Sequence, residues 1–193
     1  MRRRAEQVAH TRARIVAAAV ELHRELGPAR TTVAEIARRA GVERLTVYNH
    51  FPDERSLFGA CQEHWLAQAP PPSPAGHAAV ADPDARLKVV LGDLYAWYRR
   101  GEQMLRNVTR DAEALPALWE MLALQRQARK ETVELLLTGR RASGDRRLLA
   151  AALELVLEFR TWDTLTGTGL TDDEAAQLAG AMVAAIEGAR PPK

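Results

Sequence analysis

The segment from Thr31 to Phe51 constrains the fold of this chain more than any other stretch of its sequence. Thr32 is followed three residues later by Glu35, which is the pattern of a capping box at the start of a helix. Gly41 then ends the apolar spacing of that helix, because glycine readily adopts the left-handed conformation that a tight turn requires. A second short helix follows, and Pro52 ends it. Two short amphipathic helices joined at one glycine indicate a helix-turn-helix, a motif that can place its second helix in the major groove of DNA.

Helical periodicity continues along nearly the whole chain, and no stretch has the alternation of a convincing strand. We therefore expect an all-α fold of about nine helices, with an N-terminal three-helix helix-turn-helix domain and a C-terminal helical domain. The expected helices lie at about 15–26, 33–40, 44–49, 54–66, 82–98, 102–111, 116–137, 144–162 and 171–186.

A proline-rich stretch divides the chain, because four of the five residues from Pro70 to Pro74 are prolines and a helix cannot continue through them. We expect a first domain at 1–66, a Pro-rich loop at 67–80 and a second domain at 81–193.

Positive charge is concentrated at the N-terminal end, although the net charge of the whole chain is only +2. Residues 1–66 hold eleven arginines against eight acidic residues. This excess is consistent with contact to phosphates. The arginines that cluster at the start of the chain are Arg2, Arg3, Arg4, Arg12 and Arg14.

The sequence offers little to support catalysis or metal binding. The lone cysteine, Cys61, excludes an intrachain disulfide and a cysteine-cluster metal site. His64 lies one helical turn from Cys61, which permits a thiol–imidazole contact, but structural placement on an apolar helix face is favoured. We expect no metal, no cofactor and no enzymatic activity. No signal peptide or membrane-spanning run is present, so we expect a cytoplasmic protein with no membrane partner.

The segment from Thr31 to Phe58 resembles the helix-turn-helix of the TetR (tetracycline repressor) family of bacterial regulators. The resemblance covers about a quarter of the chain closely, and the all-helical remainder agrees only in outline. The residues that carry it are Thr32, Ile36-Ala37, Gly41-Val42 and Thr46-Val47-Tyr48-Asn49-His50-Phe51.

The residues of the second helix divide into a packing side and a side that can face DNA. Val42, Val47 and Phe51 are expected to hold the helix against its neighbours. Sequence-reading contacts to base edges are expected from Arg44, Leu45, Thr46 and Asn49. Phosphate contacts are expected from Thr32, and from Tyr48 and His50 by resemblance to the family. For His50, a local packing role stays open, and Arg44 has the alternative of a solvated surface charge.

One position departs from the family pattern. The family usually has a lysine near the start of the fourth helix that contacts the DNA backbone, and here Glu54 occupies that position. Either Arg55 supplies the missing cation, or that contact is absent and the arginine-rich N-terminus contributes more to affinity.

The resemblance implies a small effector bound among the helices of the second domain. Pockets of this kind are mostly apolar, and we expect an apolar or aromatic compound. The candidate pocket residues, for each of which a plain core role is the alternative, are Trp65, Tyr95, Tyr98, Met104, Trp119, Phe159 and Trp162. The last two helices are rich in alanine, and in the family such helices pair into a homodimer.

The sequence thus predicts a ligand-responsive transcriptional regulator, by default a repressor, that binds a palindromic double-stranded DNA operator as a dimer. Three alternatives stay open: an activator of the same family, a protein whose acidic DNA face is disabled and that acts through protein contacts, and an all-helical enzyme or carrier with an incidental N-terminal resemblance.

Overall fold

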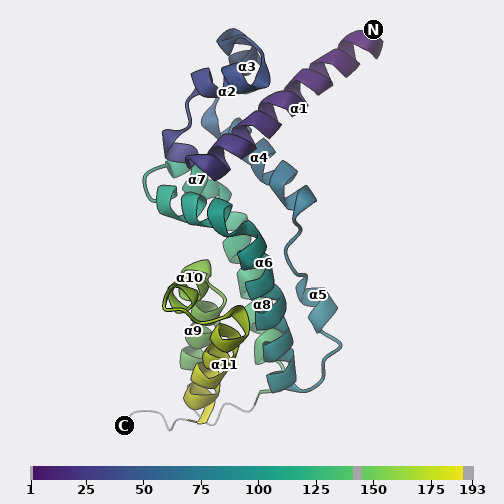
Figure 1. The fold of residues 1–193 in the computed structure, drawn as a ribbon. Helices are drawn as coiled ribbons and strands as arrows, with labels where there is room; N and C mark the ends of the chain where they lie inside the picture. The colour runs from purple at the N-terminus through teal and green to yellow at the C-terminus, as the bar shows by residue number, and fades with distance from the viewer. Residues whose placement is uncertain (1, 141–144, 189–193) are drawn as a thin grey trace. The chain divides into compact units, whose positions relative to one another are not determined.

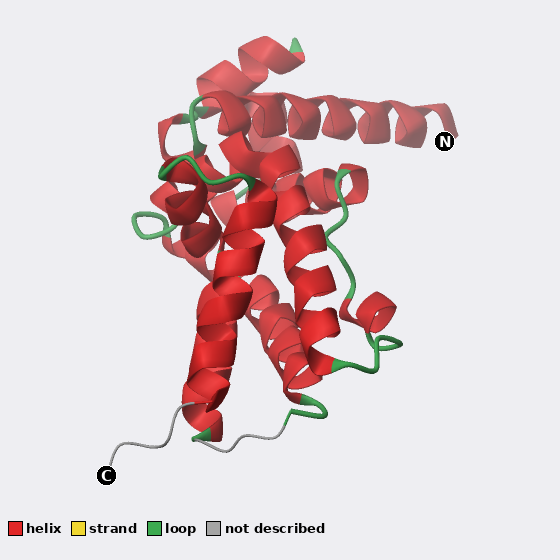
Figure 2. Ribbon diagram, turned by 60° about the horizontal axis from the view of Figure 1, so that its bottom comes forward, coloured by secondary structure: helices red, strands yellow, loops and turns green. Residues whose placement is uncertain are grey.

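The computed structural model describes residues 2–140 and 145–188, which contain helices and no strand (Figures 1 and 2). The expected all-α fold is therefore confirmed. This part of the chain forms eleven α-helices and one 3-10 helix. They are α1 (Arg2–Glu25), η1 (Pro28–Arg30), α2 (Val33–Ala40), α3 (Arg44–His50), α4 (Glu54–Gln68), α5 (Pro74–His77), α6 (Pro83–Asp111), α7 (Pro116–Met121), α8 (Ala123–Leu137), α9 (Arg146–Val156), α10 (Phe159–Gly167) and α11 (Asp172–Gly188).

The break expected between the helices at 82–98 and 102–111 is wrong, because α6 continues through Gly101. The glycine instead permits close packing between α6 and α4. A β-carbon at this position would lie 2.9 Å from Cζ2 of Trp65. A glycine inside a helix can therefore mark a close contact as readily as a helix end.

Other helix boundaries also differ from the expected ones. The helix expected at 116–137 is divided at Leu122 into α7 and α8. The helix expected at 144–162 is divided near Glu158 into α9 and α10, and its expected first residue, Gly144, lies outside the described residues. Inside the proline-rich stretch the short helix α5 was not expected, and α1 begins at Arg2, well before the first apolar position of its pattern.

The helices gather into two compact units. Unit 1 consists of Met1–Pro70 and Gly101–Ala123, and unit 2 consists of Pro71–Arg100 and Leu124–Lys193. Helix α6 therefore contributes residues to both units. The functional division at 1–66, 67–80 and 81–193 stays a prediction.

Unit 1 is built around an apolar core to which each of its first four helices contributes. Ile15 and Leu22 of α1, Ile36 of α2 and Val47 of α3 are at most 1% exposed, and Leu57 of α4 closes the cluster. The N-terminal turns of α1 extend beyond these helices, and residues 3–10 are exposed (Figure 1). The core thus fixes the C-terminal half of α1 and leaves its first turns uncovered.

Within unit 1, polar side chains of α6 donate hydrogen bonds to the backbone carbonyls at the C-terminal end of α1. The last carbonyls of a helix have no partner inside it. Here Nδ2 of Asn107 donates to the carbonyl oxygens of His23 at 3.1 Å and Arg24 at 2.7 Å. Nη2 of Arg110 donates to the carbonyl of Leu26 at 3.2 Å. The junction between α1 and η1 is therefore held by hydrogen bonds from a segment more than eighty residues away in sequence.

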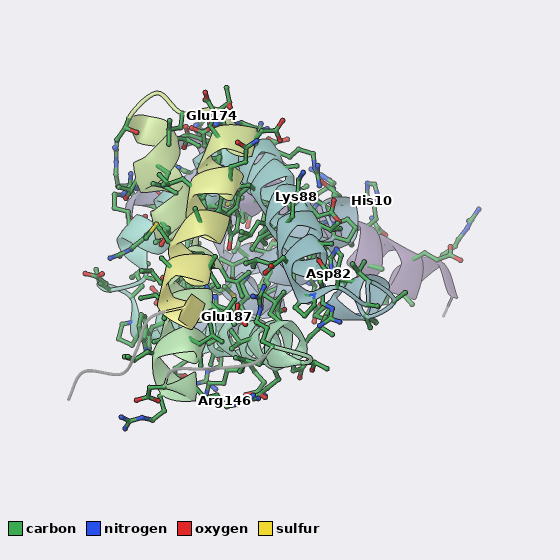
Figure 3. All side chains as sticks on the ribbon, turned by 90° about the horizontal axis from the view of Figure 1, so that it is seen from below. His10, Asp82, Lys88, Arg146, Glu174 and Glu187 are labelled. Carbon is green, nitrogen blue, oxygen red and sulfur yellow. The ribbon has the colours of Figure 1, made fainter. Side chains whose placement is uncertain are left out.

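In unit 2, two buried arginines form hydrogen bonds and ion pairs at helix ends. Arg86 of α6 donates to the carbonyl oxygens of Leu135 at 3.0 Å and Thr138 at 2.8 Å, at the end of α8. Arg140 donates to Asp84 of α6 at 2.9 Å and also pairs with Glu187. Glu187 lies near the C-terminal end of α11 (Figure 3). The ends of three helices of unit 2 are thus joined by charged hydrogen bonds.

Among the described residues, no helix is both long enough and apolar enough to span a membrane.

Two glycines of α6 provide a direct test of the packing at Gly101. Replacing Gly101 by alanine places a methyl group against the Trp65 ring, so we expect a loss of about 1–3 kcal/mol in the free energy of unfolding, typical of overpacking. Gly92→Ala is the control, because a β-carbon there meets nothing within 4 Å. We expect Gly92→Ala to stabilise by about 0.5–1 kcal/mol, since alanine favours helices over glycine. Urea unfolding followed by circular dichroism measures both values, and equal stabilisation by the two substitutions would contradict this packing.

A buried histidine makes the stability of unit 1 dependent on pH. His23 is 4% exposed, and its ring lies 5.6 Å from that of Phe58. Burial lowers the pKa of His23 to about 4, and the charge of Asp111 opposes this shift only in part. In the unfolded chain the pKa returns to about 6.5. As pH falls below about 6.5 the unfolded state takes up the proton first, so stability is lost between about pH 6.5 and pH 4.

We expect His23 alone to reduce the free energy of unfolding by roughly 2 kcal/mol between pH 7 and pH 5. His23→Gln removes this titration, so the pH dependence of the variant should be weaker by that amount in urea titrations. His10→Gln is the control, because His10 is exposed on the same helix. Parallel pH profiles for the wild type and His23→Gln would show that the folded state tolerates a charged His23.

Candidate nucleic-acid interface

Helix α3 divides into a buried and an exposed side. Val47 is 1% exposed, and Phe51, the residue that caps the helix, is 4% exposed in the same core cluster. Leu45 and Tyr48 are 65% and 53% exposed. Arg44 and Asn49 are exposed as well, and the four residues share a helix face because Arg44 and Leu45 each lie four positions before Tyr48 and Asn49, respectively. Two large, partly apolar side chains flanked by polar ones form a contact surface that the fold itself leaves uncovered.

The turn before α3 has the geometry expected from the sequence. Gly41 has φ +64°, in the left-handed region that favours glycine. The nitrogen of Val42 donates to the carbonyl of Ala37 at 3.0 Å, and Val42 is half-buried against the core. The turn therefore fixes the direction in which α3 leaves α2.

Thr32 begins α2 with a complete capping box. Its Oγ1 accepts from the nitrogen of Glu35 at 3.2 Å, and the Thr32 nitrogen donates to Glu35 Oε2 at 3.0 Å. The threonine hydroxyl also donates to Oε2 at 2.8 Å, and these hydrogen bonds lower the pKa of Glu35. A phosphate that accepted from the Thr32 hydroxyl would have to replace this bond to Glu35.

The remaining residues of α3 lie between the two sides. Thr46 and His50 are half-buried. The ring of His50 lies 6.4 Å from that of Phe51, at the end of the helix. His50 therefore has both a packing contact and solvent access, and the two interpretations given to it from sequence stay open.

Arg55 is exposed near the start of α4, and its guanidinium pairs with the carboxylate of Glu120 on α7. Glu54 is exposed beside it in the first turn of the helix, where a negative charge is favourable. Asp53 caps the helix by accepting from the nitrogen of Ser56 at 2.7 Å. The only basic residue in this first turn, Arg55, therefore already has an acidic partner. Glu120 is 65 positions away, so no local pattern could have predicted the pair.

The seven candidate pocket residues fall into different units. Trp65, Met104 and Trp119 belong to unit 1, where Met104 is buried and Trp119 is 51% exposed. Tyr95, Tyr98, Phe159 and Trp162 belong to unit 2. An effector site that uses all seven stays a prediction.

The four aromatic residues of unit 2 pack on one another. The ring centroid of Tyr98 lies 5.4 Å from Phe159, 5.8 Å from Trp162 and 6.2 Å from Tyr95. All four side chains are buried, and burial raises the pKa of both tyrosines. They form a continuous, buried aromatic cluster.

The polar atoms of this cluster are satisfied where α9 ends. The hydroxyl of Tyr95 donates to the carbonyl of Val156 at 2.8 Å, and that of Tyr98 to the carbonyl of Leu157 at 2.6 Å. These carbonyls are available because the chain leaves the helix there. Nε1 of Trp162 donates to Oδ1 of Asp172 at 3.0 Å.

An apolar stripe runs along the paired helices α9 and α11 of unit 2. Its large members are between 38% and 52% exposed, although they are apolar. The spacing of seven residues on α9, and of four on α11, places them on one side of each helix. They are Leu148 and Leu155 of α9 and Leu178, Met182 and Ile186 of α11. Figure 3 shows α11 in full view, with Glu174 near its start and Glu187 near its end.

The described residues contain no group of three histidine, cysteine or acidic side chains that could hold a metal ion. Burial raises the pKa of Cys61 to about 12, so its thiol is protonated at neutral pH. His64 has Gln68 as a partner, with Nε2 atoms 2.8 Å apart. Chemistry by a Cys61–His64 pair gains no support from this arrangement.

Residues 15–61 match the model of a family described as bacterial regulatory proteins, tetR family. A relative from Mycobacterium tuberculosis (strain H37Rv), described as an HTH-type transcriptional regulator, is 30% identical over 187 residues. The match covers 93% of this chain and 94% of that protein. The relatives found are regulators and not enzymes.

Solved structures of similar fold cover nearly the whole chain. A TetR-like transcriptional regulator from Rhodococcus sp. RHA1 superposes with a TM-score of 0.67 at 18% identity, over 93% of this chain and 97% of that one. NalD, described as the secondary repressor of the MexAB-OprM multidrug efflux pump in Pseudomonas aeruginosa, superposes with a TM-score of 0.65 at 25% identity. That match covers 94% of this chain and 97% of NalD.

Proposed function

Because the chain belongs to the TetR family and is a DNA-binding transcriptional regulator, we propose that it is a repressor that binds a palindromic operator as a dimer and leaves it when a small effector binds. The exposed side of α3 carries this proposal, since it presents Arg44, Leu45, Tyr48 and Asn49 opposite the buried Val47. A helix anchored on one side and polar on the other suits insertion into the major groove.

Within α3 we assign base reading to the residues near its start and on its exposed side. Arg44 can donate two hydrogen bonds to the O6 and N7 atoms of guanine, and Asn49 can pair with adenine. Leu45 offers an apolar contact to the methyl group of thymine, and Thr46 can make either kind of contact.

Phosphate contacts are assigned to side chains at the margins of the same surface. The hydroxyl of Tyr48 and the imidazole of His50 can donate to phosphate oxygens and so fix the register of the protein on DNA. Thr32 can do so at the N-terminus of α2, where the helix dipole favours an anion. Arg55 can replace the lysine of the family at the cost of its ion pair with Glu120.

The apolar stripe on α9 and α11 supports dimerisation. Five large apolar side chains lie along two adjacent helices, and a second copy of the chain would bury them through a two-fold symmetric interface. Alanines between them, such as Ala151, Ala181 and Ala185, permit close helix approach. A two-fold dimer would present two α3 helices to successive major grooves, which predicts a palindromic operator.

The effector is proposed to be an apolar or aromatic compound that binds in unit 2 beside Tyr95, Tyr98, Phe159 and Trp162. Its binding would stabilise an arrangement of the dimer that fits the operator poorly. The description of NalD as a repressor favours repression over activation for this chain.

DNA binding can be tested with a duplex that the wild-type protein selects from a random-sequence library, compared with a scrambled duplex by fluorescence anisotropy. We expect Arg44→Ala to reduce the preference for the selected duplex by about tenfold, because a good bidentate base contact contributes about 1–3 kcal/mol of discrimination. Tyr48→Phe should weaken binding to both duplexes alike, by a few-fold, since it removes one hydrogen bond to the backbone. Arg146→Ala, an exposed arginine of α9, is the control. Failure of the wild-type protein to enrich any sequence would overturn the proposal.

The dimer can be tested by placing a charge on the stripe. Met182→Glu should raise the dissociation constant of the dimer at least about tenfold, because a carboxylate would have to be buried. Val89→Glu is the matched control, since Val89 is 42% exposed on α6 and lies outside the stripe. Analytical ultracentrifugation measures the change. If Met182→Glu remains as dimeric as the control, the interface lies elsewhere.

A further inference from the structure

Two exposed arginines of α1 contact the residues that flank α3. Nη2 of Arg14 donates to the carbonyl oxygen of Ala40, and to that of Gly41 at 3.2 Å. The guanidinium carbon of Arg12 lies 5.0 Å from the centroid of the Phe51 ring. Residues two positions apart in a helix lie on nearly opposite sides of it, because each residue is rotated by about 100° from the last. Arg12 and Arg14 therefore reach different parts of the neighbouring structure. Ala40 and Gly41 precede α3, and Phe51 follows it.

Arg14 closes the turn that leads into α3. Ala40 is the last residue of α2 and Gly41 caps it, so their carbonyls have no partner within the helix. A cation is also favoured at this negative end of the helix dipole. A β-carbon on Gly41 would lie 2.9 Å from Nη2 of Arg14. The glycine therefore provides both the left-handed backbone and the space that the guanidinium occupies.

Arg12 acts at the other end of α3. Phe51 is buried, and its nitrogen donates to the carbonyl of Val47 at 2.8 Å, which closes the last turn of the helix. A guanidinium over an aromatic ring is attracted to its face, and the stacking also restricts the orientation of the ring. The side chain that ends α3 is thus held between the core and Arg12.

We propose that Arg12 and Arg14 are positioning residues for sequence recognition: they fix the direction and depth of α3 and do not neutralise phosphates. This inference rests on the proposed role of α3 in reading bases. The charge pattern of the sequence had instead suggested that both arginines contact DNA phosphates, together with Arg2, Arg3 and Arg4. A small rotation of α3 would misalign Arg44 with a base edge, so loss of either arginine reduces discrimination between sequences.

Salt dependence distinguishes positioning from phosphate contact. Each phosphate that a protein neutralises adds about 0.9 to the slope of log affinity against log salt concentration. Replacing an arginine that only positions α3 should leave this slope unchanged. Replacing an arginine that contacts a phosphate should reduce the slope by about 0.9, the value of one contact.

The test uses Arg14→Gln, Arg12→Gln and Arg14→Lys in the full chain, with the selected and scrambled duplexes as probes over a range of salt concentrations. We expect Arg14→Gln to lower the preference for the selected duplex about tenfold, with an unchanged salt slope. Arg14→Lys keeps the charge but lacks the planar group with its several donors, so it should also lose preference. Arg24→Gln removes an exposed arginine from the same helix and serves as the control.

All binding is measured below the melting temperature of each variant. If Arg14→Gln does not fold, Arg14→Lys and Arg12→Gln provide the same comparison. Unchanged preference with a lower melting temperature would overturn the inference, since the arginines would then serve stability alone. A reduced salt slope would also overturn it, by assigning them to phosphates. Failure of Arg44→Ala to alter preference would instead contradict the role of α3 itself.

Discussion

Backbone carbonyls at helix ends must find hydrogen-bond partners when they are buried, and this requirement recurs at four helices of the protein. Asn107 and Arg110 satisfy the end of α1, and Arg14 satisfies the end of α2. In unit 2, Arg86 serves the end of α8, and the hydroxyls of Tyr95 and Tyr98 serve the end of α9. In each case the donor comes from another helix, so the same hydrogen bonds that end one element also fix its position relative to a second.

Helix α3 also depends on contacts from outside the helix. It has seven residues, and a helix of this length is not stable alone in water. Burial of Val47 and Phe51, the turn at Gly41 and the two arginines of α1 compensate for its short length. These contacts involve one side of the helix and the residues that flank it. The other side is therefore not needed for packing. That division leaves a small uncovered surface on α3, which is the surface proposed to read DNA.

Local features of the fold could be predicted from sequence because their causes are local. The capping box of Thr32 and Glu35 and the left-handed glycine at 41 depend on neighbouring residues in the sequence. The contact of Arg14 with Ala40 spans 26 residues, and that of Tyr95 with Val156 spans 61, so no spacing rule predicts them. The close packing at Gly101 has the same kind of cause, since its partner Trp65 lies on another helix. The exposure of Arg44, Leu45 and Asn49 followed from periodicity, whereas the partial burial of Thr46 and the pairing of Arg55 with Glu120 did not.

If α1 holds α3 in place while α3 reads the bases, a crystal structure of the protein with its selected operator duplex will show both roles at once. We expect α3 in the major groove with Arg44 at a base edge, Arg14 still on the carbonyls of Ala40 and Gly41, and Arg12 still over Phe51. Guanidinium groups of Arg12 and Arg14 bonded to phosphate oxygens, with α3 outside the groove, would contradict both roles.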